Sequence, residues 1–270
     1  MTVRTASDGT RFEVVEGPGP AVLLVHGLGL NRHMWQWQRN AMAERYTVIS
    51  YDLFGHGESP PPPETPSLTL FSNQLRRLLV ELDVPRAAIA GFSLGGMIAR
   101  RFAMDHGSRL WALAILHSAH KRDQNAHDAI QFRVHQARRD GPAATVEAAL
   151  ERWFSKSFYH ANPETMRQVR DWVLANNKDI YPDIYQVLVD GVDELIAPSP
   201  PINCPTLVMT GSEDYGNSVE MTHAIAAEIP GAITVILSGL RHMAMVEDPV
   251  RFNSELLEFL AHVEEEGADG

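Results

Sequence analysis

A serine set between glycines, in the segment Gly91–Gly95 (GFSLG), is the feature that most restricts how this chain can fold. The apolar run at 87–90 predicts a buried strand before the serine, and the run at 97–102 predicts a helix after it. A strand that passes directly into a helix needs a sharp turn, whose apex residue takes a sparsely populated backbone conformation. Glycines two positions before and after the apex remove the side chains that would collide there. We therefore expect the hydroxyl of Ser93 to stand at the carboxyl end of a strand, open to a substrate.

Apolar runs typical of buried strands alternate with segments of helical periodicity along most of the chain. The expected strands cover residues 21–25, 47–51, 87–90, 110–116, 206–209 and 233–237, and the expected helices cover 34–44, 68–82, 97–102, 219–229 and 249–263. Before them, an Asp-Gly pair between two β-like runs at 3–6 and 11–16 predicts a hairpin. Strands that alternate with helices indicate an α/β fold, with a mostly parallel sheet and right-handed crossovers.

The alternation stops between residues 120 and 201, a stretch too long for a plain loop. This stretch is helical in character and rich in aromatic residues, most of which we expect to pack against one another. We therefore predict an α/β core domain formed by residues 1–119 and 202–270, into which residues 120–201 are inserted as a helical cap. A few aromatic side chains of the cap are expected to line the pocket.

Composition limits the partners and the location of the protein. A formal net charge of −11 argues against binding to nucleic acid or to an anionic membrane, since both attract basic surfaces. Cys204 is the only cysteine, which excludes an internal disulfide and a thiolate metal site. No apolar run approaches the ~20 residues of a membrane span, and the N-terminus lacks the pattern of a signal peptide. We expect a cytoplasmic protein that acts on a small molecule and water, with no cofactor and no metal; its oligomeric state is left open.

A serine hydroxyl is a weak nucleophile at neutral pH and needs a base, for which histidine is suited. The chain holds twelve histidines, so position must select among them. His242 lies in the loop after the last expected strand, which ends at the same sheet edge as Ser93. His117 and His120 also follow a strand and could border the site, whereas we expect His26 to be structural.

The base needs a carboxylate that fixes its tautomer, and the transition state needs donors for the developing oxyanion. Asp214 follows the strand at 206–209, and its neighbour Glu213 is the nearest competitor. Asp248 is expected to begin the last helix, where a carboxylate suits the helix dipole. The predicted oxyanion donors are the backbone N–H groups of Leu28 and Leu94.

Five segments together resemble the α/β-hydrolase superfamily: His26–Gly29, Asp52–Ser59, Gly91–Gly96, Gly211–Asp214 and His242. The order serine, acid, histidine along the chain is the order typical of that fold. Within the superfamily the chain is similar to small bacterial carboxylesterases and 3-oxoadipate enol-lactonases. The resemblance implies an eight-stranded sheet, a helical cap and water as second substrate. One departure is the absence of the proline that many relatives carry shortly after the acid.

The residues and the resemblance favour a serine hydrolase that cleaves a small carboxylic ester or lactone. Ser93 would be the nucleophile, His242 the base and Asp214 its carboxylate partner. A carbon–carbon bond hydrolase of the meta-cleavage type would use the same three residues, and a non-catalytic ligand receptor could use the same scaffold. Four arginines of the cap could hold a substrate carboxylate, but we expect each to be a solvated surface charge: Arg133, Arg138, Arg139 and Arg152.

Overall fold

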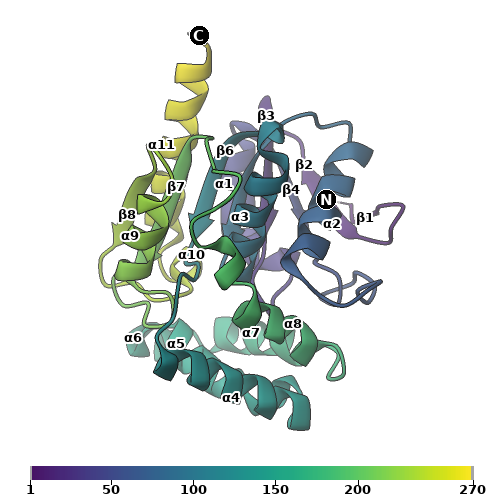
Figure 1. Ribbon diagram of the computed structural model, residues 1–270, viewed down its shortest axis with the longest axis vertical. Helices are drawn as coiled ribbons and strands as arrows, with labels where there is room; N and C mark the ends of the chain where they lie inside the picture. Colours follow the sequence, from purple (N-terminus) through teal and green to yellow (C-terminus); the bar gives the residue numbers. More distant parts are fainter. Residues whose placement is uncertain (1, 269–270) are drawn as a thin grey trace.

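A central sheet of eight strands organises the computed structural model, which describes residues 2–268 (Figure 1). The strand order is β1-β2-β4-β3-β5-β6-β7-β8. The strands are β1 (Arg4–Thr5), β2 (Arg11–Val15), β3 (Gly19–Val25), β4 (Tyr46–Tyr51), β5 (Ala87–Phe92), β6 (Leu110–Leu116), β7 (Thr206–Gly211) and β8 (Ile233–Leu237). β2 runs antiparallel to β1 and to β4, and every other pair of neighbours is parallel. The mostly parallel eight-stranded sheet is thereby confirmed.

Both faces of the sheet are covered by helices, because successive residues of each strand point to opposite sides. In β3, Leu23 and Val25 face a core shared with α2, α3 and α9, whereas Val22 and Leu24 face a core shared with α1, α10 and α11. These helices are α1 (Gln36–Ala43), α2 (Leu68–Glu81), α3 (Leu94–His106), α9 (Val219–Ala227), α10 (Ala244–Glu247) and α11 (Pro249–Ala268). The continuous apolar character of the central strands follows from this two-sided burial.

Helix positions follow from capping and periodicity. Ser67 begins α2 because its hydroxyl accepts a hydrogen bond from the backbone N–H of Leu70 at 3.1 Å. Leu68, Phe71 and Leu75 then recur at helical spacing and are fully buried against the sheet. Among residues 2–268 no helix is at once long enough and apolar enough to cross a bilayer.

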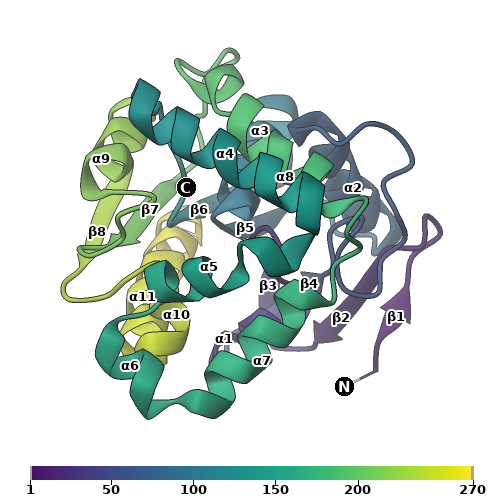
Figure 2. The same cartoon turned by 90° about the horizontal axis from the view of Figure 1, so that it is seen from below.

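The chain between β6 and β7 forms a separate group of helices below the sheet (Figure 1). We call α4–α8 the cap helices: α4 (Gln124–Asp140), α5 (Val146–Trp153), α6 (Lys156–Ala161), α7 (Pro163–Leu174) and α8 (Tyr181–Asp190). Seen from below, they lie across the end of the sheet (Figure 2). That residues 120–201 form a domain of their own stays a prediction, and residues 1, 269 and 270 of the predicted core domain lie outside the described residues.

The register of the sheet aligns the carboxyl ends of its central strands. Val25 at the end of β3 pairs with Gly91, and Phe92 at the end of β5 pairs with Leu116 of β6. Leu116 pairs in turn with Met209 of β7. Loops that are far apart in the sequence therefore leave the sheet side by side, on the side where the cap helices lie.

Candidate active site

Ser93 forms the apex of the turn between β5 and α3, with a φ of 56° and a ψ of −115°. A positive φ is strained for a residue that carries a side chain, as the sequence predicts for this position. A Cβ at Gly95 would lie 2.6 Å from the carbonyl oxygen of His26, and still closer to that of Val25. A Cβ at Gly91 would collide with the carbonyl group of Gly95. Only glycines allow the turn to close this tightly against β3.

The backbone of Ser93 is held firmly while its hydroxyl is free. Its N–H donates to the carbonyl oxygen of Leu116 at 2.9 Å, and its carbonyl accepts from the N–H of Gly96 at 3.0 Å. The hydroxyl of Ser118 also donates to that carbonyl, at 3.1 Å. Within residues 2–268, Ser93 Oγ takes part in no hydrogen bond. The side chain is therefore positioned by the backbone alone and keeps its hydroxyl available.

Asp214 and His242 form a buried hydrogen-bonded pair beside this turn. His242 Nδ1 lies 2.7 Å from Asp214 Oδ2, while the other oxygen, Oδ1, accepts the backbone N–H groups of Gly216 and Asn217 at 3.1 and 3.0 Å. Burial alone would raise the pKa of Asp214, but His242 and His117 hold that pKa well below its ordinary value. An ionised Asp214 accepts a hydrogen bond from the N–H at Nδ1, which leaves Nε2 of His242 as the basic nitrogen. No hydrogen bond joins this Nε2 to Ser93 Oγ, although both residues line one cavity.

His117 is a second histidine on the same carboxylate oxygen. It follows β6 directly, is fully buried, and places Nδ1 2.9 Å from Asp214 Oδ2. Its backbone has a φ of 49°, and the side-chain amide of Asn217 donates to its carbonyl oxygen at 2.8 Å. Burial lowers the pKa of His117, against the opposing effect of Asp214. A neutral His117 that donates from Nδ1 leaves its Nε2 buried without a partner. The sequence placed His117 near the site but did not reveal this shared contact.

The predicted oxyanion donors lie on the loop after β3 and at the start of α3, next to Ser93. Within residues 2–268, the backbone N–H groups of Leu28 and Leu94 donate no hydrogen bond, and Leu94 is the first residue of α3. A Cβ at Gly27 would lie 3.2 Å from the Cβ of Ser93, so the loop after β3 approaches the serine closely. His56 supports this loop, since the N–H of Gly29 donates to His56 Nε2 at 3.0 Å. The sequence does not reveal this contact, because His56 lies 27 residues from Gly29 along the chain.

A cavity of about 260 Å³ opens above Ser93 and His242. Three aromatic side chains of the cap line it, namely Trp153, Tyr181 and Tyr185. Three arginines also line it: Arg122, Arg133 and Arg152. The expectation of solvated surface charge is therefore wrong for Arg133 and Arg152. It holds for Arg138 and Arg139, which are exposed and pair with Asp183 and Asp140.

The end of α5 is tied to the loop that carries His242. The N–H of Met243 donates to the carbonyl oxygen of Trp153 at 2.9 Å. The side chain of Arg241 donates to the carbonyl oxygens of Glu151 and Phe154 at 2.9 and 3.0 Å. The Trp153 and His242 rings lie 6.1 Å apart between centroids. The cap thus contributes directly to the position of the histidine.

The remaining candidates have structural roles. Asp248 accepts the N–H of Arg251 at 3.1 Å at the start of α11, as expected, and Glu213 is a partly exposed partner of Arg241. His26 accepts the N–H of Leu53 at 3.0 Å. In the loop Asp52–Ser59, the Asp52 side chain accepts the N–H of Glu58 at 3.0 Å.

The one group of described residues that could hold a metal ion is His117, Asp214 and His242. The contacts within it are those of hydrogen-bonded partners.

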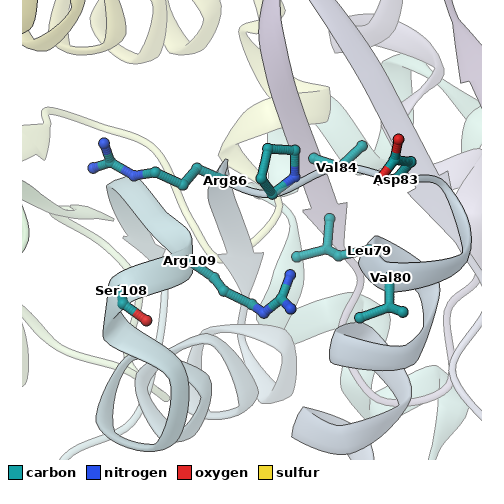
Figure 3. A pocket seen from close by; sticks show the side chains of 8 residues that line it. Leu79, Val80, Asp83, Val84, Arg86, Ser108 and Arg109 are labelled. Carbon is teal, nitrogen blue, oxygen red and sulfur yellow. The ribbon is translucent and has the colours of Figure 1, made fainter.

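A larger hollow of about 490 Å³ lies at the opposite, amino-terminal edge of the sheet (Figure 3). Arg86 and Arg109 stand just before β5 and β6, and Asp83 stands just after α2. The charged ends of the three side chains point in different directions (Figure 3). Because this hollow has no histidine and no convergent polar groups, we place the site in the smaller cavity around Ser93.

Comparisons with known proteins identify the family of this chain. The sequence profile of the Alpha/beta hydrolase family matches residues 22–255. The chain belongs to the α/β hydrolase family. Two curated relatives come from Acinetobacter baylyi. The (E)-2-((N-methylformamido)methylene)succinate hydrolase is 26% identical over 260 residues, 96% of this chain and 97% of the relative. The 3-oxoadipate enol-lactonase 2 is 26% identical over 234 residues, 87% of this chain and 86% of the relative.

Among solved structures, the enol-lactonase from Burkholderia xenovorans LB400 superimposes on this α/β hydrolase with a TM-score of 0.87 at 25% identity. The match covers 96% of this chain and all of that one, at 100%. The shared architecture therefore includes the cap helices as well as the sheet.

Proposed function

We propose that this α/β hydrolase cleaves a small carboxylic ester or lactone, with Ser93 as nucleophile, His242 as base and Asp214 as its carboxylate partner. The observation that carries the proposal is the free hydroxyl of Ser93 in a strained turn, beside the buried Asp214–His242 pair. The lactonase names of several relatives support the choice of a carboxylic ester bond.

The steps follow from the positions of these groups. Ser93 Oγ attacks the carbonyl carbon while Nε2 of His242 accepts its proton. The negative oxygen that forms is stabilised by the N–H groups of Leu28 and Leu94, each donor of this kind lowering a barrier by ~2.7–4 kcal/mol. His242 then gives its proton to the leaving oxygen, which leaves an acyl group on Ser93. Water, deprotonated by His242, releases the acid and restores the serine.

The three groups would also serve a carbon–carbon bond hydrolase, and the geometry of the site does not distinguish the two bonds. A panel of 4-nitrophenyl esters and a vinylogous diketone tests this difference, since the ester proposal predicts turnover of the esters and not of the diketone. The receptor alternative predicts tight binding and negligible turnover of both.

Labelling by a fluorophosphonate tests the nucleophile. We expect covalent modification of the wild-type protein and of Ser108→Ala, whose serine stands at the far edge of the sheet. We expect none of Ser93→Ala. Labelling of folded Ser93→Ala to the wild-type extent would refute the assignment.

A further inference from the structure

Three arginines in the wall of the cavity have no acidic partner. Arg122 stands just before α4, Arg133 lies in α4 and Arg152 lies in α5, and each is partly buried. Across residues 2–268, none of the three forms an ion pair with a carboxylate. Cap arginines that face away from the cavity do form such pairs, for example Arg138 with Asp183 at 2.9 Å and Arg170 with Glu147 at 2.5 Å. Arg167 of α7 also lacks such a pair but is exposed to solvent, so the three cavity arginines differ in being partly buried without a carboxylate partner.

Neutral groups hold two of these side chains in place. Arg122 donates from Nη1 to the carbonyl oxygen of Leu188 at 3.0 Å. Arg133 donates from Nε to the hydroxyl of Tyr185 at 3.1 Å. A guanidinium has five N–H donors, so both retain donors for another acceptor. Carbonyl and hydroxyl oxygens orient these cations without neutralising their charge.

The grouping is electrostatically unfavourable as it stands. Burial lowers the pKa of Arg122 to about 10, and the nearby charge of Arg133 acts in the same direction. Burial and Arg133 also lower the pKa of Arg152. Asp193 and Glu151 oppose these effects from a distance but do not pair with the arginines. Like charges that are removed from water and left unpaired are costly, and an anion that enters the cavity relieves that cost.

We propose that Arg122, Arg133 and Arg152 form a subsite for a carboxylate group, and that the substrate is a small ester or lactone bearing a free acid. The inference rests on the proposed hydrolase function. A volume of about 260 Å³ lies just below the usual range for ligand cavities, which suits a short acyl chain. Planar guanidinium groups pair with carboxylates through two parallel hydrogen bonds. With a net charge of −11, the protein as a whole does not attract anions, so these arginines create a local exception.

The kinetic test compares two substrates that differ only in the free acid: mono-4-nitrophenyl glutarate and its methyl ester. We expect the wild-type protein to prefer the acid at least tenfold in kcat/KM. Arg152→Gln is expected to lower the ratio of the two kcat/KM values about tenfold or more, since a hydrogen bond to a charged group is lost. Arg152→Lys keeps the positive charge and should retain part of the preference for the acid. It replaces Arg152→Gln in the test if the glutamine variant does not fold. Arg138→Gln, on the outer face of the cap, is the matched control and should keep the wild-type ratio.

A binding test separates this subsite from the hydrolytic reaction. Glutarate, glutaramide and inorganic phosphate are titrated by calorimetry into the wild-type protein and Arg152→Gln. We expect glutarate to bind the wild-type protein more tightly than the other two, and to bind the variant at least tenfold more weakly. Binding of this kind without ester turnover would refute the hydrolase function and support the subsite. Turnover with no preference for the acid, unaffected by Arg152→Gln, would refute the subsite alone. Tighter binding of phosphate would overturn the carboxylate assignment.

Discussion

Replacement of Asp214 by asparagine tests whether the buried pair sets the basic nitrogen of His242. In the wild-type protein, Oδ2 accepts from the Nδ1 atoms of His242 and His117 at 2.7 and 2.9 Å. In Asp214→Asn, Oδ1 keeps its place, because the N–H groups of Gly216 and Asn217 donate to it. The amide nitrogen then takes the place of Oδ2 and donates to both histidines. His242 must carry its proton on Nε2, so it can no longer accept one from Ser93.

The size of the effect follows from the charge that is removed. The carboxylate and the imidazolium formed during the reaction have charge centres about 4 Å apart, which corresponds to about 4 kcal/mol at an effective dielectric constant near 20. That energy alone corresponds to about a thousandfold decrease in rate. The tautomer of His242 that carries its proton on Nε2 lowers the rate further. We expect kcat to fall about 10³- to 10⁴-fold in Asp214→Asn.

The assay is the hydrolysis of mono-4-nitrophenyl glutarate at pH 8, with thermal unfolding measured on the same preparations. The variant should remain folded, because an amide can satisfy the same hydrogen-bond partners. It should also lose less stability in acid than the wild-type protein. The pKa of Asp214 is lowered on folding, so its contribution is present above the ordinary pKa near 4 and is lost as the pH falls through the folded value. A folded variant that retains activity within tenfold of wild type would refute this account of His242.

Other substitutions separate the remaining features. Gly95→Ala is expected to lower the unfolding free energy by about 1–3 kcal/mol or more, because its Cβ would collide with backbone carbonyls. Gly107→Ala, with nothing within 4 Å of an added Cβ, should unfold close to the wild-type temperature, and equal melting points of the two variants would contradict the tight packing of the turn. Asparagine tolerates a positive φ, so His117→Asn removes the contact with the carboxylate of Asp214 without straining the backbone. Urea titration should show a loss of about 1–3 kcal/mol of unfolding free energy. An unchanged midpoint would show that the contact contributes nothing to stability. Burial lowers the pKa of His56 to about 3, so below pH 6.5 the unfolded chain binds a proton that the folded protein does not bind. Between pH 7 and pH 4 the unfolding free energy of His56→Gln should therefore fall less than that of the wild-type protein. Parallel curves of unfolding free energy against pH would contradict this.

The sheet and the positions of Ser93, Asp214 and His242 could be predicted because each residue lies in the turn or loop that follows an apolar strand. In a parallel sheet the carboxyl ends of strands meet at one edge, so the spacing along the chain is enough to bring such residues to the same side. The contact between His117 and Asp214 depends on β6 and β7 being neighbours. Apolar periodicity does not specify which strands are neighbours in the sheet, so this contact could not be predicted from the sequence.

The surface position expected for Arg133 and Arg152 was wrong, and Arg122 was not considered, for a different reason. Helical periodicity separates the buried stripe of α4 from its exposed side but does not say what an edge position faces. Arg133 lies three residues after the buried Ile130 and one before the buried Val134, whereas Arg138 and Arg139 are exposed at the end of the helix. A charged residue beside such a stripe was the available signal. Its meaning depends on how the cap packs over Ser93, which the sequence alone does not specify.

The hydrogen bonds between the end of α5 and the loop that carries His242 have a practical consequence for engineering. Met243 and Arg241 are hydrogen-bonded to the backbone of residues 151–154. Cap helices taken from another hydrolase would lack these matched contacts with the loop that carries His242. Chimeras made by exchanging 120–201 alone should lose turnover even for substrates that fit. Chimeras in which residues 151–155 and 241–247 are exchanged together should keep these hydrogen bonds and the turnover.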